Sequence, residues 1–129
     1  MHLAAGAAAL PAVSRIARAQ AYPARPVRVV VGFAAGGPTD LFARVLGELL
    51  SARWGGRTVV VENRPGAGTI VATAAVAKAP PDGYTLLMVN ASFFINPAIG
   101  QKLPYDPLKD FAPIGMSESG QTAKNSQRV

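Results

Sequence analysis

Apolar residues in the middle of the chain form short runs separated by segments rich in glycine and proline. Residues 27–31 read VRVVV, residues 58–62 read TVVVE and residues 84–89 read YTLLMV. Such nearly uninterrupted aliphatic runs are typical of strands buried on both faces of a sheet. Residues 111–116 suit either a fourth strand or a linker.

Helical signals follow these runs. Residues 38–40 (PTD) suit a first helical turn, because proline and an acidic residue are favoured there, and glycines at 55–56 suit its end. The predicted apolar stripe of this helix is Leu41, Phe42, Val45, Leu46, Leu49 and Leu50. A second helix is expected over residues 69–79, ended by a turn at residues 80–83, and a short third one near residues 96–97.

The alternation of strands and helices predicts the fold class. We expect an α/β domain with a parallel sheet, helices on both faces and right-handed crossovers. Ligands of such sheets bind outside the carboxyl ends of the strands. Three segments leave these ends: the first loop (residues 32–40), the second loop (63–69) and the third loop (90–94).

The first and second loops contain several glycines, and each runs into a helix N-terminus. The first N–H groups of a helix lack a partner within it, and the aligned peptide dipoles add about half a positive charge there. Glycine lets the backbone approach a ligand closely, so amides alone can hold a carboxylate or phosphate. A tight strand-to-helix turn explains the same glycines equally well.

Nucleotide and catalytic patterns are missing. The segment GFAAGGP is neither a P-loop nor a GxGxxG fingerprint. The single histidine is His2, so Ser92 lacks a triad base, and the acidic residues show no paired spacing. The sequence contains no cysteine and no cluster of metal ligands. We therefore expect no catalytic residue, no metal and no cofactor.

Several conspicuous side chains have structural interpretations. Asp40 suits helix capping better than a ligand contact, and Asp82 suits a turn. Phe42 and Trp54 are assigned to the core. These assignments leave the loop backbones, rather than a charged side chain, as the candidate binding groups.

Composition and charge bear on one further class of function. The net charge of +6 could suit nucleic acid. The basic residues are scattered and no aromatic residues interleave with them, so no binding of nucleic acid is expected. With 50% hydrophobic and 16% charged residues, the 129 residues suit one globular domain.

Both ends differ from the middle. Residues 1–21 contain an apolar stretch and end in AQA, which is typical of an export signal, although an alanine-rich helix is the alternative. No charged region precedes the apolar stretch, so we expect the signal to be truncated at its start. Residues 117–129 have no regular period and are expected to form an aberrant or disordered tail.

Four segments are recognisable together. VRVVVGFAAGGPTDLFAR, VVVENRPGAG, AKAPPDGYTLLM and INPAIGQKLPYDPLKDFAPIG follow one another in a distinctive order and spacing. Through them, residues 22–116 resemble the substrate-binding proteins of tripartite tricarboxylate transporters. The resemblance implies the N-terminal part of the first lobe of a periplasmic-binding-protein-like fold of type II. Such two-lobed proteins close around a ligand like a Venus flytrap, and here the fold is incomplete.

The resemblance also implies a function and a set of site residues. It implies a periplasmic, non-enzymatic receptor, monomeric at full length, that captures a small carboxylate for membrane permease subunits. Backbone amides and waters bind the ligand in this family. The matching positions are Phe33, Ala34, Ala35, Gly36, Gly37, Thr39 and Asp40 in the first loop, Gly66, Ala67, Gly68 and Thr69 in the second, and Ser92 in the third.

Two loops depart from the family pattern. Thr69 stands where a further glycine is common, which hinders close approach but adds a hydroxyl group. Phe93 and Phe94 stand where a hydroxyl–histidine pair is common, which favours a less polar ligand. Two alternatives stay open: a non-functional remnant of such a receptor, and a fragment of a Rossmann-like nucleotide-binding enzyme.

Overall fold

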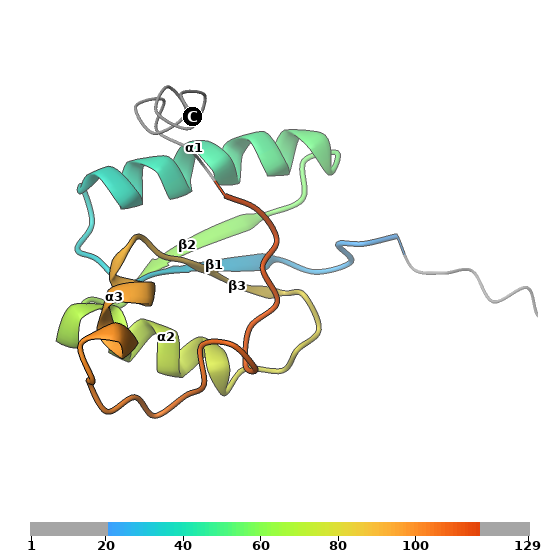
Figure 1. The fold of residues 1–129 in the computed structure, drawn as a ribbon. Coiled ribbons are helices and arrows are strands. Elements are labelled where there is room, and N and C mark those ends of the chain that lie inside the picture. Colours follow the sequence, from blue (N-terminus) through green and yellow to red (C-terminus); the bar gives the residue numbers. More distant parts are fainter. Residues whose placement is uncertain (1–20, 117–129) are drawn as a thin grey trace, which may run out of the picture.

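A computed structural model of the chain describes residues 21–116 (Figure 1). Two predicted segments lie outside the described residues. They are the export signal at residues 1–21, of which only Ala21 is described, and the tail at residues 117–129. Between residues 21 and 116, no helix has the length and apolarity needed to cross a membrane.

The centre of the structure is a parallel sheet of three strands in the order β2-β1-β3. The strands are β1 (Val27–Val31), β2 (Val59–Asn63) and β3 (Thr85–Met88). In the register, Val29 of β1 lies between Val61 of β2 and Leu86 of β3. The valines of β1 are buried, as expected for the central strand. The predicted parallel sheet is therefore confirmed.

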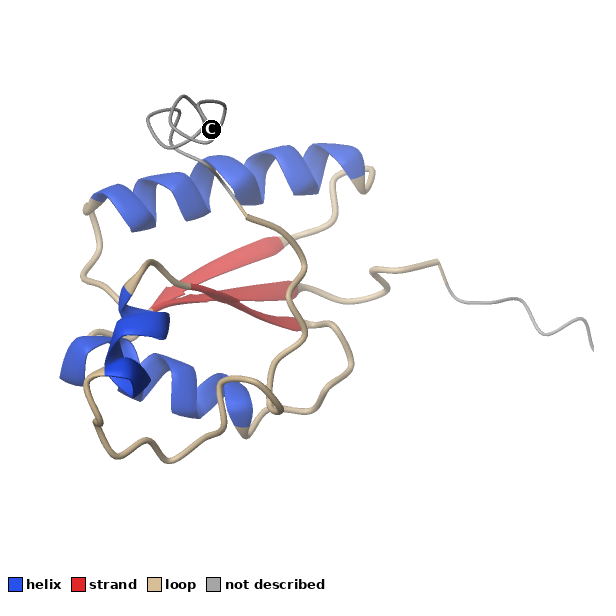
Figure 2. Cartoon of the chain, viewed as in Figure 1, coloured by secondary structure: helices blue, strands red, loops and turns tan. Residues whose placement is uncertain are grey.

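Helices cover both faces of this sheet. α1 (Pro38–Arg53) packs on β1 and β2, and α2 (Ile70–Ala77) packs on the opposite face against β3 and β1 (Figure 1). The 3-10 turn η1 (Ala67–Thr69) precedes α2, and α3 (Ser92–Ala98) follows β3. All of these helices begin at the same end of the sheet, the end to which the strands point (Figure 2). The predicted α/β class is confirmed.

The buried face of α1 differs from the predicted one. Its buried residues are Asp40, Ala43 and Gly47. The apolar residues that are 43% to 64% exposed are Leu41, Phe42, Val45 and Leu49. Small residues let the helix approach the sheet closely, since a Cβ on Gly47 would lie 3.3 Å from Val59 Cγ1. The assignment of Phe42 to the core is therefore wrong, and so is the predicted stripe at Leu41, Val45 and Leu49, whereas Leu46 and Leu50 are half-buried.

Two later elements also differ from expectation. α3 begins at Ser92 instead of near residues 96–97, because Asn90 Oδ1 accepts the backbone N–H of Ser92 and starts the turn there. Pro97 consequently lies inside the helix. Residues 111–116 form no strand, which leaves the linker interpretation.

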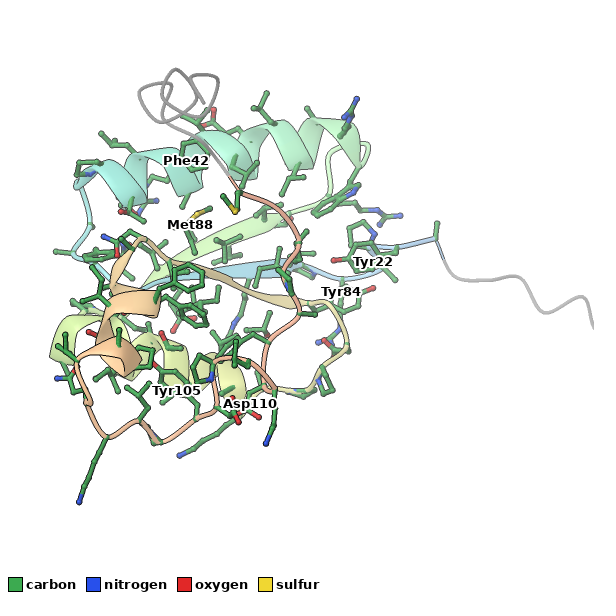
Figure 3. All side chains as sticks on the ribbon, in the orientation of Figure 1. Tyr22, Phe42, Tyr84, Met88, Tyr105 and Asp110 are labelled. Carbon is green, nitrogen blue, oxygen red and sulfur yellow. The ribbon has the colours of Figure 1, made fainter. Side chains whose placement is uncertain are left out.

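At the end of the sheet where the strands begin, the segment that precedes β1 packs against the segment that precedes β3. Tyr22 packs against Tyr84 with ring centroids 5.1 Å apart, and its hydroxyl donates to the Gly83 carbonyl oxygen at 2.6 Å (Figure 3). Asp82 accepts the backbone N–H of Tyr84 at 3.0 Å, which confirms its place in a turn. These contacts fix the chain far from the three loops and leave the loop end of the sheet free for a site.

Candidate functional site

The first and second loops are in direct contact. A Cβ placed on Gly32, which follows β1, would lie 2.8 Å from Thr69 Cβ and 2.9 Å from Thr69 Cγ2. Only glycine leaves room for Thr69 at this point. Both residues are buried, so the two loops pack as one unit.

Thr69 has a backbone conformation that glycine favours. Its φ is 80° and its ψ is −6°. A β-branched residue in this left-handed region is strained by roughly 1–3 kcal/mol. Burial against Gly32 and a hydrogen bond from Thr73 Oγ1 to the Thr69 carbonyl oxygen at 2.9 Å hold it there.

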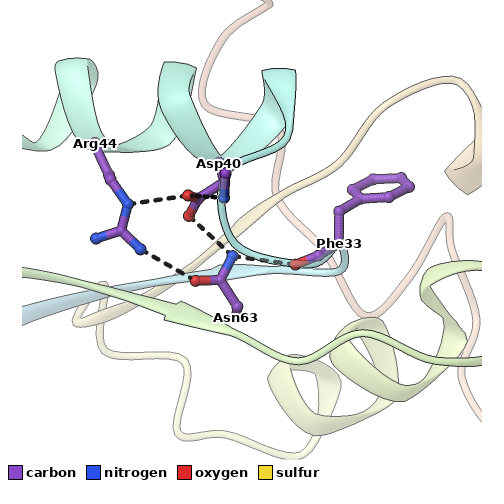
Figure 4. A network of polar contacts seen from close by, with 5 residues as sticks. Phe33, Asp40, Arg44 and Asn63 are labelled. Atoms are coloured by element: carbon purple, nitrogen blue, oxygen red, sulfur yellow. Dashed lines mark hydrogen bonds and ion pairs between the residues drawn. The ribbon is translucent and has the colours of Figure 1, made fainter.

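Asp40 and Asn63 tie the first loop to the second (Figure 4). Asp40 Oδ2 accepts the Gly36 N–H at 2.8 Å and Arg44 Nε–H at 3.0 Å. Asn63 Nδ2 donates to Asp40 Oδ1 at 2.9 Å and to the Phe33 carbonyl oxygen at 3.0 Å. Asn63 Oδ1 accepts a hydrogen bond from Arg44 Nη2 at 3.2 Å. This network fixes the shape of the first loop from both sides.

Asp40 lies in the first turn of α1, as predicted, and its carboxylate accepts the N–H of Gly36, the residue before the N-cap Gly37. Gly37 itself has no side-chain cap, so Asp40 joins the helix start to the first loop. The hydrogen bond from Arg44, followed by those from Gly36 and Asn63, lowers the pKa of Asp40 from 3.8 to about 2. Asp40 is 1% exposed, and both of its carboxylate oxygens already accept hydrogen bonds. A ligand at this place would meet its backbone rather than its carboxylate.

We expect the stability of the chain to depend on pH through Asp40. Because the pKa is lowered in the folded state, the charged carboxylate stabilises the fold above about pH 4, and this contribution is lost as the pH falls towards about 2. The free energy of unfolding of the wild type minus that of Asp40→Asn, measured with denaturant, should be constant from pH 7 to 5 and shrink below about pH 4. A difference that stays constant through acid pH would contradict the proposed network.

The third loop joins the other two through polar groups. Ser92 Oγ donates to Asn90 Oδ1 at 2.7 Å and lies 3.2 Å from Thr69 Oγ1. Asn96, one turn further along α3, donates from Nδ2 to the Gly68 carbonyl oxygen at 2.8 Å. The structure thus brings the three predicted loops together at the carboxyl ends of the strands, where parallel sheets bind ligands.

A pocket of about 500 Å³ opens between the first turn of α1 and the third loop. Its lining residues are Phe33, Ala34, Gly37, Pro38, Thr39 and Asn90. Three predicted first-loop residues do not line it: Gly36 is hydrogen-bonded to the buried Asp40, and Ala35 is exposed. The pocket brings together most of the first-loop candidates.

The second-loop candidates lie differently. Gly66, Ala67 and Gly68 are exposed, whereas Thr69 is buried against Gly32. Ser92 of the third loop contacts Thr69 and Asn90. None of these candidate residues lines the pocket. Their predicted contact with a ligand stays a prediction.

The pocket is suited to an anion even though none of its lining side chains is charged. The nearby guanidinium of Arg44 is committed to Asp40. The N-terminus of α1 is the positive end of a helix dipole. Pro38 has no N–H, and the N–H groups of Thr39 and Asp40 precede the first intrahelical hydrogen bond, which the Leu41 N–H donates to the Gly37 carbonyl oxygen. The N–H groups of Thr39 and Asp40 therefore have no acceptor within the helix. Among residues 21–116, no group of acidic, histidine or cysteine residues could hold a metal.

A second pocket, of about 590 Å³, runs along α1 and the outer edge of β2. Gly47, Glu48, Ser51 and Thr58 are among its lining residues. It holds none of the predicted site residues and does not reach the carboxyl ends of the strands. We therefore do not assign the site there.

Four residues that build the site were not predicted from the sequence: Asn63, Arg44, Asn90 and Asn96. Two of them carried a recognisable signal, since Asn63 ends β2 and Asn90 follows β3. A polar residue directly after a buried parallel strand lies at the ligand-binding edge. Arg44 stands four residues after Asp40, the spacing of a helical ion pair.

Loops joined at one end of a parallel sheet, with a pocket against a helix N-terminus, are typical of ligand-binding α/β lobes, and periplasmic binding proteins are one class built from such lobes. The chain belongs to the family described as "Tripartite tricarboxylate transporter family receptor", which matches residues 42–122. This confirms the resemblance found in the sequence. The family consists of solute-binding receptors, not of enzymes.

Relatives and solved structures agree with this family. The protein BugT of Bordetella pertussis is 43% identical over 100 residues, which cover 76% of this chain and 30% of BugT. The periplasmic binding protein BugD is 50% identical with a TM-score of 0.68, over 73% of this chain and 31% of BugD. MatC from Rhodopseudomonas palustris with bound malate is 42% identical with a TM-score of 0.65, over 71% of this chain and 31% of MatC. The chain therefore spans about three tenths of the length of the relatives it matches.

Proposed function

We propose that the chain carries the carboxylate-capturing part of a periplasmic solute receptor. In this proposal the ligand is a small diacid or related carboxylate, and the receptor, a monomer at full length, delivers it to the membrane permease subunits of a tripartite tricarboxylate transporter. The pocket at the first turn of α1 is the observation that carries the proposal. The backbone N–H groups at this pocket belong to the first turn of α1, a helix of 16 residues whose N-terminus is the positive end of its dipole.

Two further observations support a carboxylate as the ligand. MatC, which shares the fold over this lobe, binds malate. The pocket is lined by Phe33 and small apolar residues, together with the polar residues Thr39 and Asn90. This combination suits a short acid whose carboxylate meets the amides and whose carbon chain lies on apolar surface.

The proposal predicts that the chain is stabilised by diacids. Malate at a hundredfold excess over its Kd should add about 2.7 kcal/mol to the free energy of unfolding, because it binds the folded state only. Thermal melts of the 129-residue chain with malate and a panel of di- and monocarboxylates measure this effect. The matched control is malamide, the neutral diamide of malate, which should give no shift.

Two results would contradict the proposal. If no acid of the panel raises the melting temperature, or if malamide raises it as much as malate does, capture of a carboxylate is not the function of this chain. The first result would favour a non-functional remnant. A shift with ADP instead of the acids would favour the nucleotide-binding alternative.

A further inference from the structure

The side chain of Asn90 has a fixed orientation at the rim of the pocket. Asn90 follows β3 and lines the pocket opposite the first turn of α1. Its Oδ1 accepts the backbone N–H of Ser92 at 2.9 Å and the Ser92 hydroxyl at 2.7 Å. A backbone N–H can only donate, so the amide oxygen must face Ser92. The NH2 group of Asn90 therefore faces away from Ser92.

A chain of hydroxyl groups holds this orientation from the buried side. Ser92 Oγ uses its proton to bond Asn90, so at the 3.2 Å contact with Thr69 Oγ1 the Thr69 hydroxyl is the donor. Thr69 is 1% exposed and packed against Gly32. The position of Asn90 is thus fixed from the second loop through Ser92.

The NH2 group is left available for a ligand. The structure gives it no acceptor within residues 21–116. It offers two N–H donors at the rim of a pocket whose lining side chains are uncharged. A carboxylate has lone pairs for several donors, so one oxygen can meet the Asn90 amide while the other meets the α1 amides.

We propose that Asn90 is a ligand-contacting residue that donates its side-chain N–H groups to the captured carboxylate, and that Ser92 and Thr69 act as positioning residues for it. This inference rests on the proposed function and adds a side-chain contact that selects for an acceptor group. A ligand with an ammonium group at this point is disfavoured, because the amide NH2 and the helix N-terminus both present positive ends of dipoles.

The decisive variant is Asn90→Asp, which has nearly the same shape. Its carboxylate can keep both bonds from Ser92, but it replaces the two donors with a negatively charged acceptor. We expect malate binding by the 129-residue chain, measured by calorimetry, to weaken on the order of tenfold to a hundredfold. The melting temperature without ligand should change little. Gln101→Glu adds the same charge at an exposed residue and should leave binding unchanged.

Two further readouts separate ligand contact from a structural role. Ser92→Ala leaves the backbone N–H bond to Asn90 Oδ1, so malate binding should weaken by only about two- to fivefold. In the wild-type chain, the side-chain 15N–1H2 signals of Asn90 should move on addition of malate. A purely structural asparagine would not show this movement.

The outcomes distinguish this inference from the proposed function. Weak binding in Asn90→Asp with moving Asn90 signals in the wild type supports it. A wild type that binds malate, together with an Asn90→Asp variant that binds equally well, overturns the role of Asn90 and leaves carboxylate capture intact. A wild type that binds no acid removes both.

Discussion

Replacing Gly32 with alanine is expected to lower the free energy of unfolding by about 1–3 kcal/mol and to weaken ligand binding. The new methyl group would lie 2.8 Å from Thr69 Cβ and 3.2 Å from Thr69 Cα, so backbone atoms must move. The first and second loops would separate at the point where they support the pocket. Denaturant unfolding and malate calorimetry measure the two effects.

Two further variants show whether this contact is the cause. Gly115→Ala makes the same chemical change where no atom lies within 4 Å of the new Cβ, and it should be close to neutral. A Thr69→Gly background removes the two nearest atoms, Thr69 Cβ and Cγ2, and leaves only the Cα at 3.2 Å, so the same substitution at position 32 should destabilise less. Equal destabilisation in both backgrounds would contradict the steric explanation.

Replacing Asn63 with aspartate is expected to disrupt the first loop. The amide nitrogen that donates to Asp40 Oδ1 at 2.9 Å and to the Phe33 carbonyl oxygen at 3.0 Å becomes a carboxylate oxygen. The loss of these donors alone costs about 1–3 kcal/mol. At neutral pH, repulsion between the new carboxylate and Asp40 adds to this loss, although Arg44 offsets part of it.

The pH dependence of Asn63→Asp identifies the repulsion. The new carboxyl group should have a raised pKa, so its penalty is largest at neutral pH and disappears as the group gains a proton in mild acid. The stability gap to the wild type should therefore narrow between pH 7 and about pH 4. Gln101→Glu, on the exposed surface, should show no such gap. A gap that does not change with pH would contradict the contact with Asp40.

The sheet and its helices could be predicted because their signals are local. An uninterrupted run such as VRVVV at β1 has few alternatives to a buried strand, and Pro38 after a glycine pair marks the start of α1. The parallel arrangement then places the three loops at one edge. That edge is where the pocket lies, so the position of the first loop at the pocket could be predicted, whereas the individual candidates Phe33, Gly37 and Thr39 came from the resemblance to the family.

The remaining features depend on contacts between distant residues. The helical period of α1 shows that one side is apolar, but close packing on β2 selects the side with Ala43 and Gly47. The bond from Asn63 to Asp40 depends on how the end of β2 meets the first loop. The role of Thr69 likewise follows from its contact with Gly32 and its positive φ, which the sequence suggests only as a departure from a glycine.

An NMR titration of the 15N-labelled chain with malate tests the carboxylate site most directly. We predict that the largest shifts belong to the amides of Gly37 and Thr39 and to the side chain of Asn90, with none for malamide. Shifts concentrated along the other pocket, at Gly47 and Ser51, or no saturable shifts at all, would contradict the assignment of the carboxylate site to the first turn of α1.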